Sequence, residues 1–301
     1  MEMSYRLLTY ANGKGTRPGI LVDGKVYDVP GYASTREILA DWDAAQNKLR
    51  DQASAARGDG KPLDQVTLKA PILYPGGFFC ATANYTDHMY EMRKSDPPPK
   101  GETRPCFFLK TTEHSIIGSG EPAHLRPAQN QVFWEGELGV VIGRTTRSIS
   151  RDKALDCVAG YTIVNDLSDA TDQAARRKDM YGQWFGIDWF RTKSWDCSAP
   201  MGPWITPAEE VPDPQNLPMQ TVTKGETMQN SNTSKMFFSV AEQIEYLSER
   251  VTLRPGDVIA TGTCAGVGRP RGLFLEHGDE VAVTIGNLGT LKTPIVRDNM
   301  P

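Results

Sequence analysis

Short apolar runs separated by Pro and Gly recur along the chain from Pro71 onward. They are FFCAT, CFFLK, GELGVVIGR, GYTIVND, DVIATGT, EVAVTIG and GTLKTPIV. Runs of this length between turn residues predict β-strands. Helices are expected between the strands at about 85–93, 151–158 and 239–249, the last of which has apolar spacing near 3.6. Strands and helices do not alternate regularly, so we expect a mainly β fold with helices, of the α+β class.

The N-terminal part of the chain has a different pattern. Residues 4–30 alternate short strand-like pieces with Gly-rich turns, which predicts a small antiparallel meander. Residues 34–57 are rich in helix formers, with Ser34 or Thr35 available as a helix cap. The first part of the chain is therefore expected to be a small α+β unit.

A polar stretch, RGDGKPLDQVT, separates this unit from the strand-rich part. It ends at Thr67, and we place the domain boundary shortly after it, at Ala70-Pro71. The expected organisation is a small N-terminal domain, residues 1–70, followed by a larger catalytic domain, residues 71–301.

Composition and charge argue against nucleic acid and membranes as partners. The chain has 301 residues and a formal net charge of −4, so it offers no basic field for nucleic acid or an anionic membrane. No run approaches the roughly 18 apolar residues of a membrane span, and the N-terminus lacks the features of a signal peptide. Five cysteines without a CxxC pair disfavour a disulfide framework and a zinc cluster. We expect a cytoplasmic protein with a small-molecule partner.

Three carboxylates are the strongest chemical signal. Glu135 and Glu137 lie two residues apart in the apolar segment FWEGELGVVIGR, so on a strand they share one face. Burying two like charges together costs several kcal/mol unless a cation compensates. Asp166 follows another apolar run, and three oxygen donors without a His or Cys pattern favour Mg²⁺, Mn²⁺ or Ca²⁺ over zinc. The alternative is a solvated strand face, with Asp166 starting a turn.

Other polar residues are candidates for chemistry. His88 and Glu91 lie three apart, so on a helix Glu91 can orient His88 as a general base. Lys193 follows an aromatic-rich stretch, where it can pair with carboxylates or polarise an oxyanion. Thr263 lies in a Gly-rich turn whose amides can bind an anionic group. The alternatives remain a surface or core histidine, a solvated lysine and an ordinary tight turn.

Taken in order, six segments resemble the fumarylacetoacetate hydrolase family. They match NYxxHxxE, FFLK, ExELxxVIGR, GYxxxND, KSxD with MGPW, and LxPGDVIxTGTxxGVG, and they cover roughly residues 71–295. The resemblance implies a β-sandwich roll around the active site, preceded by a smaller N-terminal domain. It also implies a homodimer.

The resemblance assigns roles to the candidate residues. It makes Glu135, Glu137 and Asp166 ligands of Mg²⁺ or Mn²⁺, with Ca²⁺ as a further option. It makes His88 and Glu91 a water-activating dyad on a lid segment that orders over bound substrate.

The resemblance also implies roles for three further residues. Lys193 is expected to stabilise an enolate or oxyanion, and Gln173 and Thr263 are expected to contact substrate. The chain departs from the family where an Arg that often contacts the substrate carboxylate is replaced by Ala170. Either a 2-oxo acid has another anchor, for which the candidates are Arg93, Arg176 and Arg177, or the substrate differs.

The expected activity is divalent-metal-dependent hydrolysis of a carbon–carbon bond in a 1,3-dioxo compound, an acylpyruvate or fumarylpyruvate-like acid, in the catabolism of aromatic or related compounds. Same-fold alternatives are an oxaloacetate decarboxylase, a 2-oxo acid hydratase or dehydratase, and an isomerase, because fold does not select among them. The dyad favours a water-dependent step. A noncatalytic metal-binding or metabolite-binding protein is the alternative from another class, and it is disfavoured by the retention of the ligands, the dyad and Lys193.

Overall fold

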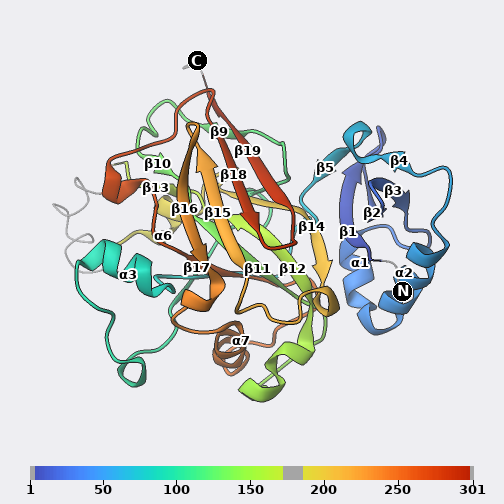
Figure 1. The fold of residues 1–301 in the computed structure, drawn as a ribbon, viewed down its shortest axis with the longest axis horizontal. Helices are drawn as coiled ribbons and strands as arrows, with labels where there is room; N and C mark the ends of the chain where they lie inside the picture. Colours follow the sequence, from blue (N-terminus) through green and yellow to red (C-terminus); the bar gives the residue numbers. More distant parts are fainter. Residues whose placement is uncertain (1–3, 172–185, 299–301) are drawn as a thin grey trace.

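The computed structural model describes residues 4–171 and 186–298. A twelve-stranded sheet runs through both the N-terminal elements and the larger part of the chain (Figure 1). Its main order is β4-β3-β2-β1-β14-β12-β11-β17-β6-β7, with β5 on β1 and β8 on β14. The strands after the N-terminal unit are β6 (Phe78–Ala81), β7 (Phe107–Leu109), β8 (Ile116–Ile117), β11 (Gly136–Ile142), β12 (Val158–Asn165), β14 (Ala199–Pro207) and β17 (Val258–Thr263).

A second sheet of five strands packs against the first. Its order is β16-β15-β18-β19-β9. The strands are β9 (Ala123–Leu125), β15 (Pro218–Thr223), β16 (Glu226–Asn232), β18 (Glu280–Ile285) and β19 (Thr290–Arg297). A short pair joins β10 (Val132–Phe133) to β13 (Ser168–Asp169). Two packed sheets with few helices confirm the expected α+β fold.

The N-terminal meander forms as expected. It consists of β1 (Arg6–Ala11), β2 (Thr16–Val22) and β3 (Lys25–Asp28), with the short strands β4 (Lys61–Pro62) and β5 (Thr67–Lys69) added later. Leu7 of β1 pairs with Ile205 of β14, so the meander extends the large sheet. The division into residues 1–70 and 71–301 stays a prediction.

The single helix expected over 34–57 is two helices, α1 (Thr35–Ala40) and α2 (Trp42–Ala55). Ser34 caps the first, because its side chain accepts a hydrogen bond from the Glu37 amide. Asp41 leaves the helical conformation between the two, at φ −108° and ψ 28°. The break lets Trp42 bury its ring with the apolar face of α2.

The other expected helices are placed correctly, with one difference in type. They are α3 (Thr86–Arg93) and α7 (Val240–Ser248), the latter opened by a capping box of Ser239 and Glu242. The segment Arg151–Cys157 is a 3₁₀ helix, η3, rather than an α-helix. Its two buried residues, Ala154 and Cys157, lie three apart, which is the period of a 3₁₀ helix.

The remaining helical segments are short. They are α6 (Trp189–Lys193) and the 3₁₀ turns η1 (Leu63–Gln65), η2 (Lys100–Glu102), η4 (Ala208–Glu210), η5 (Thr233–Lys235) and η6 (Arg269–Arg271). Within the described residues, no helix is long and apolar enough to cross a membrane.

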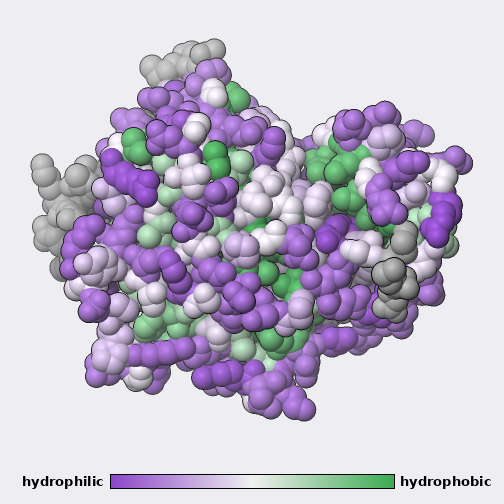
Figure 2. All heavy atoms as spheres, viewed as in Figure 1, coloured by the Kyte–Doolittle hydropathy of each residue, from purple (hydrophilic) through white to green (hydrophobic). Residues whose placement is uncertain are grey.

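The hydrophobic core lies on both faces of the large sheet. Along β11, Leu138 and Val140 belong to the core cluster that includes the five-stranded sheet. Val141 belongs to a second cluster that includes α1 and α2. Because strand residues alternate between faces, Glu137 starts on the Val141 side, at the end of this packed layer. The face drawn in Figure 2 is largely hydrophilic, with hydrophobic residues gathered near its middle and near β5.

Candidate active site

Glu135, Glu137 and Asp166 converge at one edge of the large sheet. Glu137 belongs to β11, Glu135 precedes that strand, and Asp166 follows β12. The two strands pair antiparallel with Gly136 opposite Asn165, so the start of β11 lies beside the end of β12. One carboxylate oxygen from each residue lies within 4.8 Å of the others. The structure therefore brings together the three residues selected as metal ligands.

Lys193 lies directly against this group, which we call the carboxylate triad. It is the last residue of α6, and its Nζ is 2.8 Å from Glu135 Oε2 and 2.7 Å from Asp166 Oδ2. Its side chain is buried. The solvated alternative for Lys193 does not hold in this structure, because the ammonium group is enclosed with two carboxylates.

Sequence reasoning missed a second buried lysine, Lys110. Its Nζ lies 2.8 Å from Asp166 Oδ1, and its side chain is fully buried. It also donates to three backbone carbonyls, those of Leu167 (3.2 Å), Lys193 (2.6 Å) and Ser198 (2.7 Å). The signal in the sequence was a lysine at the end of the apolar run CFFLK, but that run gives no indication of its partner.

Burial and charge shift the ionisation of the triad in opposite directions. Burial, followed by the charges of Asp166 and Glu135, raises the pKa of Glu137 well above its ordinary value. Burial also opposes ionisation of Asp166, but Lys110 and Lys193 outweigh it and lower the pKa of that carboxyl. Burial lowers the pKa of Lys193, whereas Asp166 and Glu135 raise it by more. Glu137 is therefore the carboxylate that most needs another cation.

The residues fit a hard divalent cation. With all three carboxylates ionised, the two ammonium groups leave one negative charge uncompensated, and the candidate ligands are all oxygens. The Gly262 amide donates to Glu137 Oε2 at 2.9 Å, which orients that side chain. Magnesium or manganese would supply the missing charge, with Glu135, Glu137 and Asp166 as the holding residues.

His88 and Glu91 form the expected pair on α3. His88 Nδ1 lies 3.1 Å from Glu91 Oε2, and the His88 ring is buried. Because carboxylate oxygens accept hydrogen bonds, this contact suits the His88 tautomer with its proton on Nδ1, which leaves Nε2 as the nitrogen that can accept a proton. Glu91 Oε1 accepts from the Gly266 amide at 3.0 Å, so the carboxylate is fixed at both oxygens.

The Thr263 hydroxyl is engaged within the protein. It donates to the Gly136 carbonyl at 2.9 Å and accepts from Gln229 Nε2 at 2.8 Å. Thr263 therefore links the end of β17 to the start of β11. Its role as a substrate contact stays a prediction.

The substrate-anchoring candidates are only partly within the described residues. Ala170 is buried, and its amide donates to the Gln131 carbonyl at 3.0 Å. Arg93 ends α3 on the surface. Gln173, Arg176 and Arg177 lie outside the described residues.

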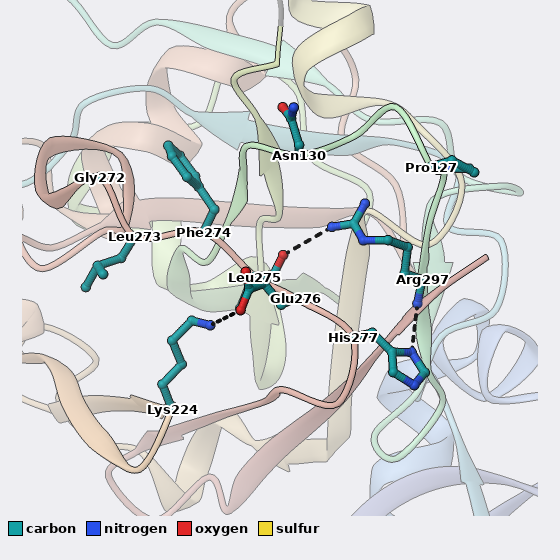
Figure 3. A pocket seen from close by; sticks show the side chains of 10 residues that line it. All are labelled: Pro127, Asn130, Lys224, Gly272, Leu273, Phe274, Leu275, Glu276, His277 and Arg297. Atoms are coloured by element: carbon teal, nitrogen blue, oxygen red, sulfur yellow. Dashed lines mark hydrogen bonds and ion pairs between the residues drawn. The ribbon is translucent and has the colours of Figure 1, made fainter. Parts of the chain in front are cut away.

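A pocket of about 680 Å³ lies elsewhere, between the 272–277 loop and Arg297 (Figure 3). Its charged groups already have partners. Arg297 donates to the Gln129 carbonyl at 2.8 Å, and Lys224 pairs with Asp279 at 2.7 Å. None of the residues that line this pocket belongs to the triad or the dyad, so we assign the chemistry to the triad instead.

Comparison with known proteins gives the same family along most of the chain. The family model described as fumarylacetoacetate (FAA) hydrolase C-terminal matches residues 77–296. The chain is also 37% identical over 283 residues to 2,4-didehydro-3-deoxy-L-rhamnonate hydrolase of Sphingomonas sp. (strain SKA58). That match covers 93% of this chain and 92% of the relative.

Solved structures extend the similarity to the whole fold. Maleylpyruvate hydrolase from Sphingobium sp. SYK-6, in complex with manganese(II) ion and pyruvate, is similar with a TM-score of 0.77 at 25% identity. That comparison covers 98% of this chain and 100% of the other. The 2-hydroxyhepta-2,4-diene-1,7-dioate isomerase from Mycobacterium marinum has a TM-score of 0.74 at 31% identity, covering 99% of this chain and 100% of the other.

Proposed function

Because this chain belongs to the fumarylacetoacetate hydrolase family, we propose that it is a divalent-metal-dependent hydrolase that cleaves a carbon–carbon bond in a 2,4-dioxo acid. The relatives named above are hydrolases and an isomerase, which supports an enzyme. The observation that carries the proposal is the buried carboxylate triad with Lys193 bridging two of its members.

The substrate class follows from the shared chemistry of candidate substrates. Acylpyruvates are 2,4-dioxo acids, and the substrate named for the Sphingomonas relative also carries oxidised carbons at positions 2 and 4. In such an acid the carbonyl at carbon 2 is adjacent to carbon 3. When the bond between carbons 3 and 4 breaks, carbon 3 can therefore leave as part of an enolate. We therefore extend the proposed substrates from acylpyruvates to sugar-derived 2,4-dioxo acids.

The protein's own groups perform the proton transfers. His88 Nε2 accepts a proton from water, while Glu91 holds the Nδ1 proton and stabilises the imidazolium. The resulting hydroxide attacks the carbonyl carbon at position 4. The bond between carbons 3 and 4 then breaks, and its electron pair forms the enolate of a 2-oxo acid. The His88 imidazolium returns its proton to carbon 3, which yields the ketone and restores the base, and the second product is a carboxylic acid.

Lys193 places a permanent positive charge beside the developing enolate, because neighbouring carboxylates raise its pKa. When bound at the triad, Mg²⁺ or Mn²⁺ supplies Lewis acidity and a template for adjacent substrate oxygens. Two members of the triad face Lys193, so the ammonium group also restrains the ligand side chains.

An isomerase or an oxaloacetate decarboxylase is the competing activity. Neither reaction has to add water to the product, whereas a histidine held by a carboxylate is suited to activating water. The fold alone does not distinguish these reactions. The dyad is the feature that favours hydrolysis.

A substrate panel tests the proposal. The purified protein, stripped with EDTA and resupplied with Mg²⁺ or Mn²⁺, is mixed with acylpyruvates, fumarylpyruvate, a 2,4-dioxo sugar acid and oxaloacetate. Loss of diketone absorbance and product analysis report turnover, with Glu137→Ala and His88→Ala as variants. We expect metal-dependent hydrolysis that both variants lose. Consumption of oxaloacetate alone, with activity retained in His88→Ala, would replace hydrolysis with decarboxylation.

A homodimer is retained as a separate prediction. Light scattering coupled to size-exclusion chromatography measures the mass directly. A mass near 66 kDa, twice the 33.2 kDa of one chain, is expected.

A further inference from the structure

A single turn supplies backbone amides to three carboxylates. The turn comprises residues 262–266, at the end of β17, and we call it the amide turn. The Gly262 amide donates to Glu137 Oε2 at 2.9 Å. The Ala265 amide donates to Asp87 Oδ1 at 3.2 Å, and the Gly266 amide donates to Glu91 Oε1 at 3.0 Å. The first acceptor is in the carboxylate triad and the other two are on α3. The amide turn therefore joins the proposed metal site to the helix that carries His88.

The amide turn is fixed by two glycines in tight surroundings. Gly262 has φ +93°, and a Cβ there would lie 2.7 Å from the Cβ of Asn84. Gly266 has φ +109°, and a Cβ there would lie 2.0 Å from the Met228 carbonyl oxygen. Neither position accepts an ordinary side chain without backbone movement. The direction of the three amides is thus determined by packing.

Asp87 is a carboxylate that the proposed reaction does not use. It precedes His88 on α3 and is bound by three donors from separate segments. Besides the Ala265 amide, its Oδ2 accepts from Ser231 Oγ at 2.9 Å and from Lys235 Nζ at 3.3 Å. The side chain is 22% exposed, so these interactions are partly shielded from water.

Asp87 and Glu91 lie four residues apart, on the same face of α3. By itself, the contact from Glu91 joins the helix to the amide turn at one point. A second contact one helical turn away fixes its rotation. His88 lies between the two contacts in sequence, so both contacts constrain the position of its side chain.

We propose that Asp87 is a positioning residue, which fixes the orientation of His88 relative to the carboxylate triad by tying α3 to the amide turn. This inference rests on the proposed function, because it assigns His88 the task of activating water. A displacement of about 1 Å at a catalytic group can cost on the order of 100-fold in rate. The contribution of Asp87 should therefore appear in the chemical step.

The competing explanation is a purely structural one. A carboxylate in the first turn of a helix also stabilises that helix. The test therefore needs a second aspartate with similar partners and no connection to His88. Asp279 meets that requirement, because it accepts from the Glu276 amide at 2.8 Å and pairs with Lys224 at 2.7 Å. Its side chain is 16% exposed.

The experiment compares Asp87→Asn with Asp279→Asn in the full-length protein. In Asp87→Asn the new amide group must face a donor, because both oxygens of the native carboxylate accept hydrogen bonds. The measured quantities are kcat and KM for a 2,4-dioxo acid that the parent hydrolyses, the Kd for Mn²⁺ by calorimetry, and the urea midpoint of unfolding. Mn²⁺ binding provides a readout that does not depend on turnover.

We expect Asp87→Asn to lower kcat by about 10-fold to 100-fold while KM changes by no more than about twofold. The Kd for Mn²⁺ should stay close to the parent value, because the triad is intact. Asp279→Asn should keep the parent kcat even if its urea midpoint falls by a similar amount. A kcat of Asp87→Asn no lower than that of Asp279→Asn overturns the inference and leaves the proposed function standing.

A second variant serves if Asp87→Asn does not fold. The double substitution Ser231→Ala and Lys235→Met keeps the carboxylate and removes both partners of its Oδ2. Those two partners hold the carboxylate in place against the Ala265 amide, so a selective fall in kcat is expected without them, and a parent-like kcat overturns the inference. A parent that hydrolyses no 2,4-dioxo acid overturns the proposed function, and the inference fails with it.

Discussion

Lys110 and Lys193 contact different oxygens of Asp166. Lys110 Nζ lies 2.8 Å from Oδ1, and Lys193 Nζ lies 2.7 Å from Oδ2. The two lysines come from separate parts of the chain, and the Lys193 carbonyl also accepts a hydrogen bond from Lys110 at 2.6 Å. Lys110 thus holds both the carboxylate and the backbone of the other lysine. This arrangement keeps Asp166 ionised in a buried position.

Replacing Lys110 should destabilise the protein strongly. Lys110→Met leaves Asp166 with one cation and removes the donor from three buried carbonyls. Breaking a buried ion pair by removing one partner typically costs about 3–5 kcal/mol in the free energy of unfolding. Urea denaturation measures this change.

Lys69→Met is the matched control for Lys110→Met. Lys69 pairs with Glu121 through side chains that are both partly exposed. Such a pair contributes about 0–1 kcal/mol. Equal losses for the two variants would show that burial of Lys110 has no special consequence.

Glu137→Gln should separate metal affinity from folding. The glutamine keeps an oxygen to accept from the Gly262 amide, but it removes the charge that burial and two neighbouring carboxylates disfavour. We expect Mn²⁺ affinity to fall by at least about 10-fold, since loss of even a supporting residue has that effect. The metal-free variant should be as stable as the parent or more so. Calorimetric titration and urea denaturation provide the two values, and unchanged Mn²⁺ affinity would exclude Glu137 as a ligand.

In the metal-free protein, the free energy of unfolding should depend on pH because the pKa of Glu137 is raised. Above the ordinary pKa of 4.5, the unfolded chain releases this proton while the folded protein retains it. The free energy of unfolding therefore falls as pH rises from 4.5 toward the raised pKa. Thermal or urea unfolding between these limits should show the decline in the parent but less of it in Glu137→Gln. Saturating Mg²⁺ should also remove it, and an identical slope in all three samples would contradict the assignment.

Asp166 should affect the free energy of unfolding at lower pH than Glu137 does, and its contribution should rise with pH instead of falling. Its pKa is lowered in the folded protein, so its stabilisation is complete above 3.8 and is lost as pH falls through the folded value. Acid unfolding of Asp166→Asn should therefore be less steep than that of the parent below pH 3.8. Parallel acid transitions would show that Asp166 is not ionised in the folded protein.

The dyad should affect the rate and not the metal site. His88→Ala removes the base and is expected to lower kcat by about 10²-fold to 10⁴-fold. Glu91→Gln keeps an acceptor for the Gly266 amide, so it should lower kcat less while α3 stays in place. Both variants should bind Mn²⁺ like the parent. Steady-state kinetics and calorimetry on the same preparations check this, and weakened Mn²⁺ binding would place the dyad in the metal site.

The carboxylate triad was predictable because its signal is local. Two glutamates at a spacing of two in an apolar run, and an aspartate after a second run, indicated strands that bury acids. The register that joins them, Gly136 opposite Asn165, depends on long-range pairing. The burial of Lys110 depends on the same packing and was therefore missed.

Other features were decided by tertiary contacts. The pairing of Leu7 with Ile205 makes the N-terminal meander part of the large sheet, and nothing in the local pattern of residues 4–30 specifies it. The break at Asp41 divides a segment whose composition favours one helix. From the sequence, the amide turn could either bind an anionic group or be an ordinary tight turn, and its local pattern does not specify that three of its amides bind the protein's own carboxylates.

The most direct test of hydrolysis is to follow the solvent oxygen. The protein with Mn²⁺ is incubated with a 2,4-dioxo acid in water enriched in ¹⁸O, and the products are examined by mass spectrometry, with corrections for exchange at the ketone. Hydrolysis predicts one solvent oxygen in the newly formed carboxylic acid, and His88→Ala should lose this product. Substrate conversion without a new carboxylic acid, or without solvent oxygen in it, would contradict carbon–carbon hydrolysis.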